Sequence, residues 1–146
     1  MIEQIKLSGR LFVYEGRASI SQHLVGSAKP TAVIDNMMPT AGRAWLMGGG
    51  SLSDIDAVKI GDDATARQMS QTDLFNSLFS ASPTSFRVVD TKRVTELFVG
   101  VGVANFTHRE IGIFAGSVLV STLVIDPEFT KDVTKTRTYI HEMGWL

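Results

Sequence analysis

The side chains best suited to chemistry are three histidines, His23, His108 and His141. They lie far apart in the sequence, and none has the HExxH spacing that places two metal ligands on one helix face. A shared metal site would therefore depend on the fold alone, and we expect surface or hydrogen-bonded histidines instead. The chain has no cysteine, which excludes thiolate nucleophiles, disulfides and sulfur-based zinc sites.

Other catalytic patterns are incomplete. Serine is abundant, but the GxSxG turn that exposes a nucleophilic serine is absent. The run Gly48-Gly49-Gly50-Ser51 lacks the lysine and Ser/Thr that complete a phosphate-binding loop. Asp54 and Asp56 lie near Asp62 and Asp63 without the spacing of an EF-hand calcium loop. We therefore expect no enzyme, no catalytic residue, and no bound cofactor or metal.

The charge distribution argues against a nucleic-acid partner. Fourteen basic and fifteen acidic residues give a net charge of -1, without the basic stripe that phosphate binding requires. Glu3 and Lys6 interrupt the apolar residues at the N-terminus, which is untypical of a signal peptide. No run approaches the roughly twenty apolar residues of a membrane helix. We expect no membrane partner, and synthesis in the cytoplasm or assembly into a particle there.

The second half of the chain predicts β-structure. Residues 85–90, 94–104, 110–125 and 135–145 are rich in the branched and aromatic residues that suit a pleated, half-buried surface. Ala115-Gly116-Ser117 separates two apolar runs and indicates a tight hairpin. With 146 residues and 44% hydrophobic residues, the chain is long and apolar enough for one core.

The first half predicts less regular structure. Residues 2–25 alternate loosely and suggest two short strands. Residues 26–50 contain Pro30, Pro39 and three successive glycines, which indicates a loop-rich excursion or arm. A short helix is predicted over 73–79, with Thr72 or Asp73 as N-cap and an apolar stripe formed by Leu74, Phe75, Leu78 and Phe79.

These segments predict a mainly β protein with one domain over residues 1–146, folded as a β-sandwich or jelly-roll-like domain with one short helix. Bulky apolar residues near polar or terminal positions are candidates for contacts with a partner. The terminal Gly144-Trp145-Leu146 needs either core docking or insertion into a neighbouring subunit. The candidate interface residues are Phe12, Tyr14, Trp45, Phe129, Trp145 and Leu146.

Two stretches in residues 58–146 resemble the N-terminal domain of phage tail-collar fibres and related small virion proteins. Val58-Lys59-Ile60-Gly61-Asp62-Asp63, followed by Thr72-Asp73-Leu74, resembles that family's strand, turn and TxL opening. Residues 106–116 (FTHREIGIFAG), followed by Leu119-Val120, resemble its REIGLF hairpin, and Thr134-Lys135-Thr136 resembles the lead into its last strand. The two motifs also occur in the family's order.

The resemblance implies structural residues and no catalytic ones. Gly112 would permit close approach of a neighbouring element, and Glu110 would accept hydrogen bonds from backbone or arginine donors. The residues that carry the motif are Gly61, Leu74, Arg109, Glu110, Gly112 and Phe114.

The same resemblance implies a virion protein that packs with copies of itself, as a trimer or ring, and with other virion proteins. The family domain usually heads a long fibre, whereas this chain stops at Leu146, so we expect a free-standing tail, collar, baseplate or fibre-adaptor component. A capsid cement or decoration protein is one alternative. The other is a carbohydrate-binding β module with Trp45 or Tyr14 as a stacking platform.

Overall fold

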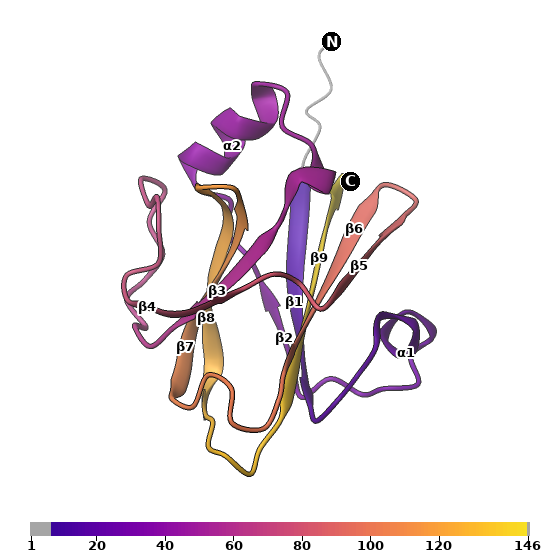
Figure 1. The fold of residues 1–146 in the computed structure, drawn as a ribbon. Coiled ribbons are helices and arrows are strands. Elements are labelled where there is room, and N and C mark those ends of the chain that lie inside the picture. The colour runs from indigo at the N-terminus through magenta and orange to yellow at the C-terminus, as the bar shows by residue number, and fades with distance from the viewer. Residues whose placement is uncertain (1–6, 146) are drawn as a thin grey trace.

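The protein is a β-sandwich of two antiparallel sheets (Figure 1). The computed structural model describes residues 7–145. One sheet has the order β2-β1-β9-β6-β5, with β1 (Leu7–Glu15), β2 (Ala32–Asp35), β5 (Ser85–Val89), β6 (Lys92–Val99) and β9 (Arg137–Trp145). The other has the order β4-β3-β7-β8, with β3 (Ala57–Gly61), β4 (Ser77–Ala81), β7 (Thr107–Ala115) and β8 (Val118–Thr130). The predicted mainly β sandwich is therefore confirmed.

The core lies between the sheets and follows from alternation along the strands. Successive side chains of a strand point to opposite faces, so every second residue faces the opposing sheet. Leu11 and Val13 of β1 and Tyr139 and Met143 of β9 are buried in this way. The four-stranded sheet contributes Val58, Ile60, Ile111, Ile113, Val120, Leu123 and Ile125.

The hairpin predicted at residues 115–117 is present. Ala115 of β7 pairs with Val118 of β8, and Gly116 in the turn between them has φ +58°. A positive φ is costly for most residues but not for glycine, so Gly116 allows the chain to reverse tightly.

The first half is more ordered than the sequence predicts. Residues 2–25, expected to form two strands, contain β1 and the helix α1 (Ile20–Val25), which begins with a capping box formed by Ser19 and Gln22. The expected loop-rich excursion over 26–50 contains β2 and the helix α2 (Thr40–Met47), and a 3-10 turn, η1 (Leu52–Asp54), follows. No helix in residues 7–145 has the length and apolar content to cross a membrane.

The helix predicted over 73–79 is wrong. Residues 71–76 are irregular and contain no helix, and β4 begins at Ser77. Phe79 pairs with Ile60 of β3 and packs on the core, whereas Leu78 is 50% exposed, so the apolar residues follow the period of a strand. The N–H groups of Phe75 and Asn76, available to begin a helix, instead donate to Glu110.

The two sides of the sandwich differ. On one side β2 and β8 lie together, and Met37 and Thr122 exchange backbone hydrogen bonds of 2.9 Å in both directions. On the other side the chain passes from β4, at the edge of one sheet, to β5, at the edge of the other (Figure 1). This second side leaves two sheet edges without a paired strand in the described part of the chain.

Candidate functional site

The most elaborate polar site surrounds Glu110 on β7. Its carboxylate is fully buried and accepts four hydrogen bonds. Oε1 accepts from Arg67 Nη1 at 2.9 Å and from the Phe75 N–H at 2.9 Å. Oε2 accepts from the Asn76 N–H at 2.8 Å and from the Asp63 N–H at 3.2 Å. One carboxylate therefore fastens both ends of the 62–76 segment to the four-stranded sheet.

Arg67 is held as completely as its partner. Its Nη2 donates to the carbonyls of Thr65 at 2.6 Å and Asp63 at 3.1 Å, and its Nε donates to Thr65 at 3.1 Å. The guanidinium carbon lies 4.8 Å from the centre of the Phe75 ring. Both charges are therefore engaged inside the chain, where they attach the 62–76 segment to the sheet.

Two glycines make room for this arrangement. A Cβ on Gly61 would lie 2.2 Å from the Asn76 carbonyl oxygen and 2.4 Å from Glu110 Oε2. A Cβ on Gly112 would lie 2.9 Å from both Leu74 Cδ2 and Phe114 Cε2. The structure therefore brings together five of the six motif residues of the sequence analysis, namely Gly61, Leu74, Glu110, Gly112 and Phe114.

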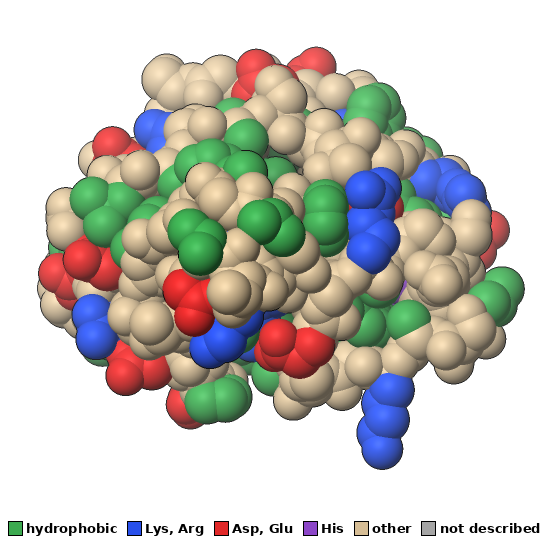
Figure 2. Space-filling view, turned by 60° about the horizontal axis from the view of Figure 1, so that its bottom comes forward, with side chains coloured by type: hydrophobic (Ala, Val, Ile, Leu, Met, Phe, Trp, Pro, Cys, Tyr) green, Lys and Arg blue, Asp and Glu red, His purple; other side chains and the backbone are tan. Residues whose placement is uncertain are grey.

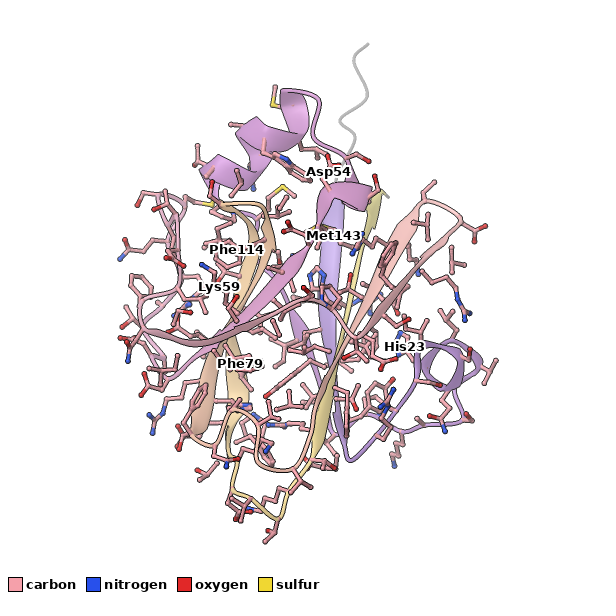
Figure 3. The ribbon with its side chains drawn as sticks, viewed as in Figure 1. His23, Asp54, Lys59, Phe79, Phe114 and Met143 are labelled. Atoms are coloured by element: carbon pink, nitrogen blue, oxygen red, sulfur yellow. The ribbon has the colours of Figure 1, made fainter. Side chains whose placement is uncertain are left out.

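The sixth motif residue, Arg109, binds elsewhere. Its Nε pairs with the Glu128 carboxylate of β8, and its Nη1 donates to the Asp62 carbonyl at 3.2 Å. Nearby on the same sheet, the Lys59 ammonium lies 4.2 Å from the centre of the Phe114 ring (Figure 3). These contacts add to the attachment of residues 59–63.

Gly61→Ala is expected to lower the free energy of unfolding by about 1–3 kcal/mol, because the added methyl displaces the Asn76 carbonyl or the Glu110 carboxylate. Urea unfolding measures the loss. Gly100→Ala is the matched control, since its Cβ would lie 3.5 Å from Phe98 Cε1, an ordinary van der Waals distance. Equal losses in the two variants would show that the space beside Glu110 is not tight.

His108 is buried between the sheets. Its Nε2 lies 2.9 Å from the Ala104 carbonyl and must donate to it, so its Nδ1 accepts from the Tyr139 hydroxyl at 2.7 Å. Burial lowers the pKa of His108 to about 4. The side chain is therefore neutral at pH 7 and stabilises the fold.

His141 is buried on β9. Its Nε2 lies 3.3 Å from the Ser121 hydroxyl, which also accepts from Asn36, and burial lowers the pKa of His141 to about 4. Its Nδ1 has no hydrogen-bond partner among residues 7–145. Within that range, no three His, Asp or Glu side chains are grouped as a metal would require.

His23 fastens α1 to the five-stranded sheet (Figure 3). Its Nδ1 lies 2.5 Å from the Tyr14 hydroxyl, and its Nε2 pairs with the Glu142 carboxylate. Burial alone would raise the pKa of Glu142, but hydrogen bonds from His23 and Lys92 outweigh it and lower the pKa overall. The three histidines thus lie at three separate places, and each holds its own part of the fold.

The four candidate interface residues whose side chains the structure describes do not form one surface. Tyr14 is 3% exposed and lies with Phe12 in the small core beside α1. Trp45 of α2 is half-buried against the main core. Phe129 is half-buried beneath the Arg137 guanidinium, whose carbon lies 4.0 Å from the ring centre. The Trp145 side chain and Leu146 lie outside the described residues.

A different surface has the character of an interface. No residue from Leu74 to Phe86 is charged, and this run contains β4 and the first two residues of β5, the two open edge strands. We call residues 74–88 the edge strip. Its exposed apolar side chains are Phe75, Leu78, Phe86 and Val88. The absence of charged residues between Asp73 and Arg87 can be read from the sequence. The location of these residues at two sheet edges cannot.

Figure 2 shows one face of the molecule. That face carries hydrophobic side chains in small groups separated by charged and other side chains. Scattered apolar residues of this kind are normal on a protein surface. Exposed apolar side chains beside the unpaired backbone groups of an edge strand are less usual, because those backbone groups can template the addition of another strand.

The fold and its contacts define an antiparallel β-sandwich in which the buried side chains of Glu110 and His108 are hydrogen-bonded within the chain. No protein-family model, curated protein or solved structure matches the chain.

Proposed function

We propose that the chain is a structural subunit of a bacteriophage particle, in the tail, collar, baseplate or fibre-adaptor region, and that it works by packing against copies of itself and neighbouring chains. The observation that carries the proposal is the edge strip, where two unpaired sheet edges carry exposed apolar side chains and Arg87 is the single charged residue. Strand addition to such an edge gives affinity through the backbone and does not require a ligand pocket.

The buried polar groups support a structural role. The Glu110 carboxylate has four donors, and His108 uses both ring nitrogens within the chain. The placement in a phage tail rests on the resemblance of residues 58–146, in which five of the six motif residues, Glu110 among them, lie together. A decoration protein of the phage head would use the same kind of surface and is distinguished by immunogold labelling of particles.

The carbohydrate-binding alternative has less support. A stacking platform must present the face of an aromatic ring to solvent. Tyr14 is almost fully buried. The Trp45 ring packs against the core and against Gly50, whose added Cβ would lie 2.3 Å from Trp45 Cε2.

Immunogold electron microscopy of purified phage particles that encode the chain tests the proposal. We expect label at the tail or neck. Label spread over the capsid would instead favour a head decoration protein. Absence of label, with antibody binding shown on the free chain, would overturn the virion role and leave a binding module outside the particle.

A further inference from the structure

Of the four sheet edges, two are already covered. β2 and β8 are edge strands of different sheets that lie against each other and share the Met37–Thr122 bridge. Helix α2 also packs against β8, where a Cβ on Gly42 would lie 2.6 Å from the Val120 carbonyl oxygen. These edges have little backbone left for a partner.

The β4 edge is interrupted. Ile60 of β3 pairs with Phe79, whereas the next residue, Gly61, pairs with Ser77, so Leu78 is skipped by the register. A bulge of this kind bends an edge strand and protects it against strand addition.

The β5 edge has no such interruption. Its five residues pair with β6 in unbroken register, from Ser85–Glu96 to Val89–Lys92, and the hairpin closes with a two-residue turn. Val89–Lys92 is therefore the hydrogen-bonded closing pair, and the alternate residues Phe86 and Val88 direct their N–H and C=O groups away from the sheet. Their side chains are 55% and 58% exposed.

The single charge on β5 does not block this edge. Arg87 Nη2 donates to Ser21 Oγ of α1 at 3.0 Å, which holds the guanidinium on the outer face of the sheet. Phe86 lies on the other face, over the Arg93 guanidinium at 4.0 Å from carbon to ring centre. A strand approaching in the plane of the sheet meets uncharged backbone flanked by Phe86 and Val88.

We propose that this partner is a second copy of the chain, and that β5 pairs antiparallel with β5 of the copy about a two-fold axis. The inference rests on the proposed function and specifies its contact. The residues that face outward along this edge, Phe86 and Val88, are apolar and exposed, so the edge offers nothing that selects a charged strand, whereas an identical strand has the same length and brings the same two apolar residues. The pair would join two five-stranded sheets into one, and it can stand alone or be one contact of a larger ring.

Charge also selects the register. Centring the pair on Arg87 would place the two arginines directly opposite each other, which is unfavourable. Centring the pair on Val88 would place the charged Asp90 of each copy opposite the apolar Phe86 of the other. Centring it on Phe86 pairs the two aromatic rings and sets Arg87 opposite Ser85, so this register is the one we propose.

Single introduced cysteines test the register, because the chain has none of its own. Under mild oxidation, Phe86→Cys is expected to give a disulfide-linked dimer. Val88→Cys is not, because the two copies of residue 88 would stand four residues out of register, well beyond the roughly 7 Å limit between disulfide Cα atoms. Cross-linking of Val88→Cys but not Phe86→Cys, or of neither, would overturn the proposed pairing.

A charge variant tests the contact itself. Val88→Lys is expected to weaken self-association at least tenfold, measured by light scattering. The melting temperature of the variant should equal that of the original chain. Val133→Lys, at a site 60% exposed in a remote loop, is the matched control and should associate normally. Association that survives Val88→Lys but is lost in Leu78→Lys would overturn the β5 contact while leaving the proposed function intact. Absence of the chain from particles would instead remove the proposed function.

Discussion

Glu110→Ala is expected to lower the free energy of unfolding by about 3–5 kcal/mol, the usual cost of removing one partner from a buried ion pair. The loss arises because Arg67 keeps a buried charge without its partner, while three backbone N–H groups lose their acceptor. Chemical denaturation followed by circular dichroism measures the change. Amide exchange should also accelerate at Phe75 and Asn76, whose N–H groups would no longer be bonded to the carboxylate.

Glu128→Ala provides the control for Glu110→Ala. It removes the same charge from the adjacent strand β8, but the Glu128 side chain is 57% exposed and pairs with the half-exposed Arg109. Exposed pairs contribute at most about 1 kcal/mol. If the two alanine variants lost equal stability, the carboxylate of Glu110 would not hold the 62–76 segment.

The second large effect is a loss of stability in mild acid. Burial lowers the pKa of both His108 and His141 to about 4, whereas the unfolded chain binds these protons near pH 6.5. The unfolded state therefore carries more protons between pH 6.5 and 4, and stability falls as the pH falls through that window. At pH 5 the loss relative to pH 7 is about 2 kcal/mol for each histidine.

Denaturant titrations between pH 7 and pH 5 measure this effect above the range in which most carboxylates titrate. His108→Gln retains a polar side chain that does not titrate, so it should remove about half of the pH dependence even if it lowers stability at pH 7. The double replacement of His108 and His141 should remove most of it. An unchanged slope in both variants would contradict the assignment of neutral, buried histidines.

The sequence predicted those features that depend on neighbours along the chain. Alternation of branched and aromatic residues indicated the strands from β5 onward, and Gly116 marked the β7–β8 turn. The resemblance also pointed to Glu110 as an acceptor for backbone and arginine donors, and to Gly112 as a position of close approach. Both expectations concern residues of one strand, β7, and their contacts with the segments beside it.

The features that the sequence did not predict depend on distant contacts. Leu74, Phe75, Leu78 and Phe79 have helical spacing, but Glu110 withdraws two N–H groups from that segment and β3 pairs with residues 77–81. Tyr14 was a candidate for a partner surface because its contact with His23 of α1 cannot be read from the sequence. The edge strip was overlooked because an uncharged run becomes an interface only when its strands lie at sheet edges.

Sedimentation velocity of the purified chain over a wide concentration range tests the central claim most directly, namely that the chain works by associating with copies of itself. We expect the mass to rise with concentration from 15.9 kDa to a dimer or a larger multiple. A mass that stays at 15.9 kDa at every concentration, with no incorporation when the chain is added to assembling particles, would contradict the account.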